Sequence, residues 1–158
     1  MIRALRSAAK VNERVGVLFL DSDRFKDIND NFGHAAGDAV LVAVAERVRA
    51  QLREDDLVAR LGGDEFAVLL APLNKIEDAQ RIADKIIASM DQPIPLPGNT
   101  QVLTSLSIGI AIYPDHGATP GTLLNAADVA MYQAKRLSSG SQQTAEPVHS
   151  VVNVQHRS

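Results

Sequence analysis

The apolar run Val15-Gly16-Val17-Leu18-Phe19-Leu20 constrains the fold more than any other segment of this chain. A strand that is apolar on both faces must be buried on both faces, so other elements have to cover each side of it. The run leads directly into Asp21-Ser22-Asp23. Open α/β sheets place ligands at the carboxyl ends of their buried strands. We therefore expect a layered domain with a ligand site where this strand ends.

The periodicity of the remaining apolar residues predicts the other elements. The chain reads as strand, helix, hairpin, helix, strand, helix, which indicates an α/β (α+β) sandwich with helices packed on a central mixed, largely antiparallel sheet. The strand over 104–112 is apolar on one face and small on the other, so a helix or a ligand can approach it closely. A proline-rich loop is expected at 93–97. The other expected elements are a helix over 37–52, a hairpin over 57–70, a helix over 79–90 and a helix from Thr119-Pro120 to Leu137.

Length and composition predict one domain. Of the 158 residues 46% are apolar, which suits a single core spanning 15–137, after a lead-in helix over 1–14 and before a polar, disordered tail over 138–158. The net charge of -3 offers no broad field for duplex nucleic acid. The absence of cysteine excludes disulfides and thiolate zinc sites and fits a reducing cytoplasm. No apolar run reaches the roughly 20 residues of a membrane span, so this segment is expected to make no membrane contact, while a membrane-anchored parent protein stays open.

Four carboxylates lie beside predicted strand ends: Asp21, Asp23, Asp64 and Glu65. If they converge, their mutual repulsion calls for a divalent cation with hard oxygen ligands, Mg²⁺ or Mn²⁺. Either pair taken alone is better explained as a helix cap or a solvated turn. Both pairs together favour a functional site.

Three polar residues follow the first strand. Lys26 is either a solvated helix lysine or a phosphate contact. Asn29 and Asp38 are either helix caps or groups that read a guanine edge, because their oxygens can accept bonds from its ring N–H and amine.

These segments together closely resemble the GGDEF family of diguanylate cyclases, over about residues 15–137. The resemblance implies a palm-like nucleotide cyclase fold that binds one GTP. In a homodimer, each 3′-hydroxyl attacks the α-phosphate of the opposite GTP, which releases pyrophosphate and yields cyclic di-GMP. The matching stretches are Leu20–Asp30, Phe32–Asp38, Arg60–Phe66, Ser107–Ala111 and Ala127–Lys135.

The resemblance also implies roles for individual residues. Asp64 and Glu65 are the implied catalytic carboxylates, and they share the cation with Asp21 and the backbone carbonyl of Ser22. The implied substrate contacts are Asn29, Asp38 and Leu41 for guanine, and Lys26, Gly62, Gly63 and Lys135 for the triphosphate.

Arg53 and Asp56 form an Arg-x-x-Asp that matches the family's product-inhibition site in its placement ahead of Gly62. The same pattern is commonly a charged helix end, but its position favours feedback binding of cyclic di-GMP. Two departures keep a second function open, a weak or inactive domain that binds GTP or cyclic di-GMP and regulates an attached domain such as a phosphodiesterase. Ser139 stands where the family has a phosphate-contacting arginine, and the family's usual segment ahead of the first strand is missing.

Overall fold

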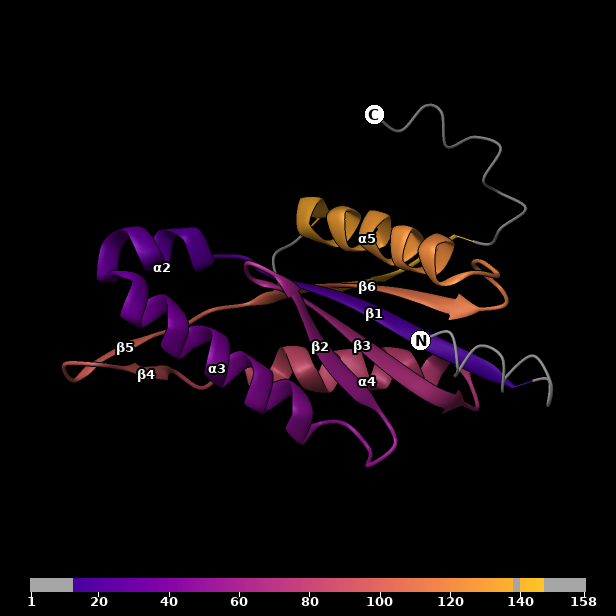
Figure 1. The fold of residues 1–158 in the computed structure, drawn as a ribbon, viewed down its shortest axis with the longest axis horizontal. Helices are drawn as coiled ribbons and strands as arrows, with labels where there is room; N and C mark the ends of the chain where they lie inside the picture. Colours follow the sequence, from indigo (N-terminus) through magenta and orange to yellow (C-terminus); the bar gives the residue numbers. More distant parts are fainter. Residues whose placement is uncertain (1–12, 138–139, 147–158) are drawn as a thin grey trace.

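The structure is a computed structural model, and it describes residues 13–137 and 140–146 (Figure 1). The predicted lead-in helix falls almost wholly outside these residues, as does most of the predicted tail. Within the described residues, no helix is both long and apolar enough to cross a membrane.

The central sheet has five strands in the order β2-β3-β1-β6-β7. The predicted mixed, largely antiparallel sheet is confirmed, because β1 pairs antiparallel with both β3 and β6, and only β7 runs parallel to its neighbour. The strands are β1 (Arg14–Ser22), β2 (Leu57–Gly62), β3 (Glu65–Leu73), β6 (Leu106–Tyr113) and β7 (Gln142–Thr144).

Helices cover both faces of β1, as its apolar run predicted. Leu18 and Leu20 belong to the core under α3 (His34–Ala50) and α4 (Ile76–Ser89), whereas Val17 and Phe19 pack against α5 (Pro120–Leu137). Figure 1 shows α5 on one side of the sheet and α3 and α4 on the other. The buried strand is therefore the middle layer of three.

The small face of β6 lets α5 approach closely. A Cβ built on Gly109 would overlap the backbone carbonyl of Ala127 and the backbone of Met131 in α5. The opposite face of the strand carries Leu106, Ile108, Ile110 and Ile112 into the other core. The predicted cap of α5 is confirmed as well, since the Thr119 hydroxyl accepts a hydrogen bond from the Thr122 backbone N–H at 3.2 Å.

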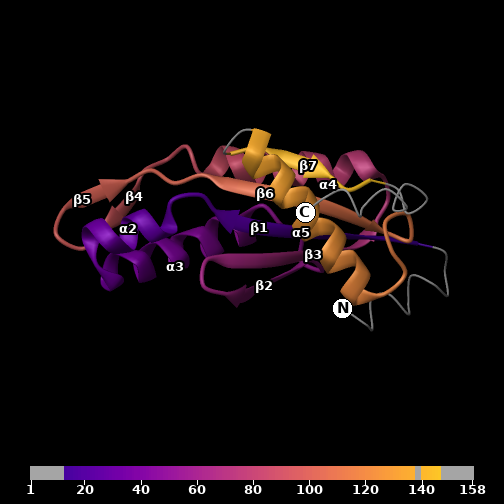
Figure 2. The same cartoon turned by 90° about the horizontal axis from the view of Figure 1, so that it is seen from above.

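Five elements differ from the prediction. Residues 25–32 form a separate short helix, α2 (Phe25–Phe32), which ends at Gly33 with φ 90°. The region expected to be a loop contains a small ribbon, β4 (Ile94–Leu96) and β5 (Thr100–Val102), beside α2 and α3 (Figure 2). Arg14 begins β1 instead of ending a helix.

The tail prediction is wrong for residues 142–144, which form β7. Main-chain bonds hold this strand: Ile108 N–H donates to the Ser141 carbonyl at 3.0 Å, and Ala145 N–H donates to the Ile110 carbonyl at 2.7 Å. The strand residues themselves are Gln142, Gln143 and Thr144. A strand that depends on main-chain pairing leaves no apolar alternation in the sequence.

We expect Gly109→Ala to lower the free energy of unfolding by about 1–3 kcal/mol, because the added methyl group must push α5 away from β6. Gly121 offers a matched control in α5, since a Cβ there would meet nothing within 4 Å. Gly121→Ala should be neutral or stabilising by up to about 1 kcal/mol. Urea unfolding of both variants measures the difference, and equal effects would contradict the tight packing.

Stability should also fall as the pH drops below about 6.5, the ordinary histidine pKa. Burial lowers the pKa of His116, whose Nδ1 accepts a hydrogen bond from the Ile112 N–H at 2.7 Å. The unfolded chain thus takes up a proton at a higher pH than the folded chain, and stability is lost on acidification. In His116→Asn, an amide oxygen can accept the same bond without titrating. Urea unfolding at pH 8 and pH 5 should show a smaller loss in this variant than in the wild type. An identical loss would contradict the assignment.

Candidate active site

The sheet register brings the predicted carboxylates together at one end of the central strands. Asp21, near the end of β1, lies opposite Glu65 at the start of β3. The backbone N–H of Ser22 also lies 3.4 Å from the Asp64 carbonyl. The β2–β3 hairpin can turn so tightly because Gly63 has φ 48°, and the Arg60 Nε donates to the Gly63 carbonyl at 2.8 Å. The strand end and the glycine hairpin therefore build one site.

Asp21 has one occupied and one unoccupied carboxylate oxygen. Its Oδ2 accepts a hydrogen bond from the Lys135 ammonium at 2.7 Å. Its Oδ1 is buried without a hydrogen-bond partner. A buried carboxylate oxygen without a partner costs free energy, so the site is suited to a further cationic ligand.

The carboxyl groups of Asp64 and Glu65 have pKa values above their ordinary range. Burial raises the pKa of Asp64 to about 6, and Asp21 adds to the shift because it accepts a hydrogen bond from the protonated form and repels the ionised form. Burial also raises the pKa of Glu65, and the charges of Asp21 and Asp128 add to this effect. Partly buried carboxylates that lie close together should show such shifts.

The donor set fits a hard divalent cation that keeps several non-protein ligands. Among the described residues, no three carboxylate or imidazole groups are gathered into a ready-made metal cage. Mg²⁺ commonly uses one or two carboxylates together with water and phosphate oxygens. The unpartnered Asp21 oxygen and the adjacent Asp64 match that requirement.

Lys135 supplies the positive charge of the site from α5. Burial alone would lower the pKa of this ammonium, but its hydrogen bond to Asp21 and the charges of Asp21, Asp23 and Asp64 raise the pKa overall. Lys135 therefore stays charged beside the carboxylates. Lys26, by contrast, is exposed in the first turn of α2.

Asp23 differs from the other acidic residues, because its oxygens already have partners. Oδ2 accepts from the Ser105 hydroxyl at 2.5 Å and from the Gly140 N–H at 3.1 Å, and Oδ1 accepts from the Ser107 hydroxyl at 2.7 Å. Its side chain is 5% exposed. The sequence grouped it with the candidate cation ligands, and only the small polar face of the 104–112 strand hinted at these hydroxyl partners.

The predicted guanine readers meet where α2 joins α3. The side-chain oxygen of Asn29 is buried without a partner, and it packs so closely on Gly37 that a Cβ there would overlap it. Asp38 is exposed at the start of α3. Leu41 is 7% exposed and belongs to the main core, as its place on the apolar stripe predicted. One unpartnered acceptor and one exposed carboxylate thus lie near the helix junction.

Arg53 and Asp56 lie apart from this site and bind each other. The guanidinium donates through Nε to Asp56 Oδ2 at 3.0 Å and through Nη2 to Oδ1 at 2.8 Å. The Arg53 backbone N–H also donates to Oδ2 at 2.9 Å, and Nη2 reaches the Pro72 carbonyl at 2.8 Å. The pair therefore closes the turn after α3 onto the end of β3.

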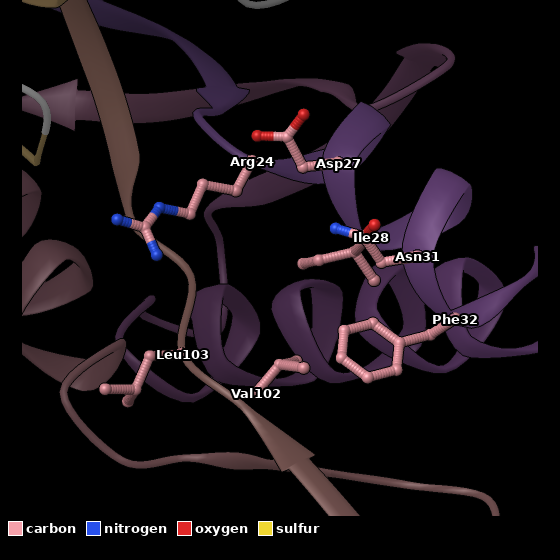
Figure 3. Close-up of a pocket in the computed structure, with 7 residues that line it drawn as sticks. All are labelled: Arg24, Asp27, Ile28, Asn31, Phe32, Val102 and Leu103. Atoms are coloured by element: carbon pink, nitrogen blue, oxygen red, sulfur yellow. The ribbon is translucent and has the colours of Figure 1, made fainter.

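A pocket of about 350 Å³ lies on a different stripe of α2 (Figure 3). It lies between α2 and the segment that follows β5, and it contains none of the predicted site residues. Its lining residues are Arg24, Asp27, Ile28, Asn31, Phe32, Val102 and Leu103.

Comparison with known proteins gives one consistent result. The family model described as diguanylate cyclase, GGDEF domain, matches residues 2–141. Diguanylate cyclase TpbB of Pseudomonas aeruginosa (strain UCBPP-PA14) is 65% identical over 144 residues, which are 91% of this chain and 33% of the relative. The chain thus spans about a third of that relative's length.

Solved structures agree in fold. The GGDEF domain of TpbB from Pseudomonas aeruginosa superposes with a TM-score of 0.90 at 64% identity, covering 91% of this chain and 84% of that one. The GGDEF domain of DgcB from Caulobacter crescentus, solved in complex with cyclic di-GMP, gives a TM-score of 0.80 at 26% identity, covering 90% of this chain and 84% of that one.

The Arg53–Asp56 pair should contribute to stability. The Asp56 side chain is 0% exposed, so Arg53→Ala leaves a buried carboxylate without its ion partner and should cost about 3 kcal/mol of unfolding free energy. The pair of Arg81 and Asp78, whose carboxylate is 29% exposed, has the same spacing and serves as a control. Arg81→Ala should cost less than about 1 kcal/mol. If urea unfolding gives the same small value for both variants, the pair has no structural role.

Proposed function

Because this chain belongs to the GGDEF domain family of diguanylate cyclases, we propose that it condenses two molecules of GTP into cyclic di-GMP and two of pyrophosphate. The observation that carries the proposal is the buried, unpartnered Oδ1 of Asp21 at the strand end where the glycine hairpin places Asp64 and Glu65. Since GTP is a cytoplasmic nucleotide, we place the reaction in the cytoplasm.

Asp21, Asp64, Glu65 and the Ser22 carbonyl would hold Mg²⁺ or Mn²⁺. When bound, the ion supplies positive charge that stabilises the oxygens entering and leaving the α-phosphorus. The protein contributes carboxylates at fixed backbone positions, because β1 and β3 hold Asp21 and Glu65 opposite each other. This rigidity positions the reacting groups.

Asn29, Asp38 and Leu41 would bind guanine. The exposed Asp38 carboxylate can accept bonds from the guanine ring N–H and amine, and the unpartnered Asn29 oxygen offers a further acceptor. The Leu41 side chain would lie beneath the base while it continues to pack in the core. The Asn29 and Asp38 oxygens would therefore favour guanine, with its ring N–H and amine donors, over adenine.

Lys26 and Lys135 would bind the triphosphate, and the backbone at Gly62 and Gly63 would let it approach the hairpin. Lys135 already stands at the carboxylates, bonded to Asp21. Its ammonium can turn from Asp21 to a phosphate oxygen once a cation neutralises the carboxylate. Lys26 is exposed and forms no salt bridge within the described residues, so it is available to an incoming nucleotide.

The reaction needs two copies of the chain, because each site binds one GTP. The 3′-hydroxyl oxygen of one GTP forms a bond to the α-phosphorus of the other, and the bond from that phosphorus to the bridging oxygen of the β-phosphate breaks. The hydroxyl proton passes to the carboxylates at Asp64 and Glu65. A second, equivalent step closes the ring.

We also propose that cyclic di-GMP inhibits the enzyme through Arg53 and Asp56. An arginine fork can bind phosphate or a guanine edge, and a carboxylate can bind a guanine N–H. Both groups are engaged with each other, so the product has to replace the Arg53–Asp56 bonds with its own. Product binding therefore competes with a structural ion pair.

The purified chain with GTP and Mg²⁺ should release pyrophosphate and form cyclic di-GMP. Turnover per molecule should rise with protein concentration, because only dimers are productive. Asp64→Ala combined with Glu65→Ala should lower turnover by at least about 100-fold. Pyrophosphate release and chromatography of the nucleotides measure these quantities.

Asp84→Asn is the matched control, since Asp84 is exposed in α4 and its substitution should leave turnover unchanged. Persistent activity in the double alanine variant would refute the site. GTP binding without turnover at any protein concentration would instead favour the regulatory binding module.

A further inference from the structure

Asp23 joins three segments that are distant in sequence. It follows β1, and its carboxylate accepts hydrogen bonds from Ser105 and Ser107 at β6 and from the Gly140 N–H beyond α5. Its own backbone N–H donates to the Ser105 carbonyl at 3.0 Å. A carboxylate that is 5% exposed and accepts three side-chain or backbone donors is fixed in place.

The same carboxylate faces the active-site lysine. Asp23 Oδ1 lies 4.0 Å from the Lys135 ammonium, whose direct hydrogen bond goes to Asp21 at 2.7 Å. The Lys135 ammonium therefore lies between Asp21, which has an oxygen without a hydrogen bond, and Asp23, whose oxygens both accept hydrogen bonds. Asp21 thus keeps one oxygen available to a cation, whereas each Asp23 oxygen already accepts at least one hydrogen bond.

The chain beyond α5 is fastened at the same point. The Ser141 hydroxyl donates to the Ala134 carbonyl at 3.0 Å, in the turn of the helix just before Lys135. The Ser141 carbonyl accepts from Ile108 in β6. Gly140 supplies the N–H to Asp23, and its φ of 74° favours glycine. The residues after α5 thus connect the helix to the sheet, through Gly140 to Asp23 and through Ser141 to Ile108.

We propose that Asp23 is a positioning residue, which holds the end of α5 against the catalytic edge of the sheet and thereby places the Lys135 ammonium for the triphosphate. The proposal rests on the proposed function for the role of Lys135. Asp23 is less suited than Asp21 to hold a cation, because each of its oxygens already accepts a protein hydrogen bond, whereas Asp21 Oδ1 accepts none. Asp23 acts on the nucleotide through Lys135.

A double-mutant cycle tests this link. The probe is GTP with a methylene bridge between its α- and β-phosphates, which binds without reacting, titrated calorimetrically in Mg²⁺. Asp23→Asn keeps the shape of the side chain and removes its charge, and it should weaken binding by about tenfold, the size of one charge-assisted hydrogen bond. In a Lys135→Met background the same change should weaken binding less than about twofold.

Equal weakening in both backgrounds would overturn the proposal, because Asp23 would then act on the cation or the nucleotide directly. Unchanged affinity in Asp23→Asn would overturn it as well. Asp84→Asn, in the exposed part of α4, is the control for loss of one carboxylate charge.

Amide hydrogen exchange without nucleotide gives a second readout. Asp23→Ala removes the acceptor of the Gly140 N–H, so exchange at Gly140 and in β7 should accelerate by about tenfold or more. Unchanged exchange would overturn the positioning role even if binding changed. If the wild type fails to bind the analogue, the proposed function fails, while the exchange result still decides whether Asp23 fastens the chain beyond α5.

Discussion

The burial of β1 on both faces is the constraint on which the rest of this structure depends. An apolar strand in the middle layer needs a paired strand on each side for its backbone and a helical layer on each face for its side chains. Here β3 and β6 satisfy the backbone, and α5 on one face and α3 with α4 on the other cover the side chains. Such a strand can carry polar residues only where it leaves the core. The acidic residues at the end of β1 are therefore delivered to the rim of the sheet together with those of the neighbouring hairpin.

The second constraint is electrostatic, because the carboxylates at this end of the sheet lie close together. Asp21, Asp64 and Glu65 repel each other and are partly withdrawn from water, and the raised pKa values of Asp64 and Glu65 express that cost. Lys135 offsets part of it by bonding one Asp21 oxygen and leaves the other without a partner. This incomplete neutralisation is the basis of the proposed binding of a cation and a phosphate. The repulsion that helps to raise these pKa values is also the reason that we propose a divalent ion here.

Much of this arrangement could be predicted from the sequence, because it depends on patterns that local sequence records. The Gly62-Gly63 turn, the Thr119 cap and the small face around Gly109 each follow from the geometry of a single element. β7 could not be predicted, because main-chain bonds to β6 hold it and its polar side chains carry no pattern. The role of Asp23 could not be predicted either. Whether a carboxylate next to a strand end is free or occupied depends on hydroxyl and amide donors more than 80 residues away, at Ser105, Ser107 and Gly140.

The same limit applies to Arg53 and Asp56, and it has a consequence for feedback control. A sequence motif specifies which groups are present, but the structure decides whether they are available. The buried Asp56 carboxylate is bonded to Arg53 through both oxygens, so a ligand that binds either residue must first break a bidentate pair. If opening that pair costs about 3 kcal/mol, product affinity is about 100-fold weaker than it would be at a site with both residues free. The proposed feedback through this motif would then begin only at product concentrations higher by the same factor, so the stability of the turn after α3 would set its threshold.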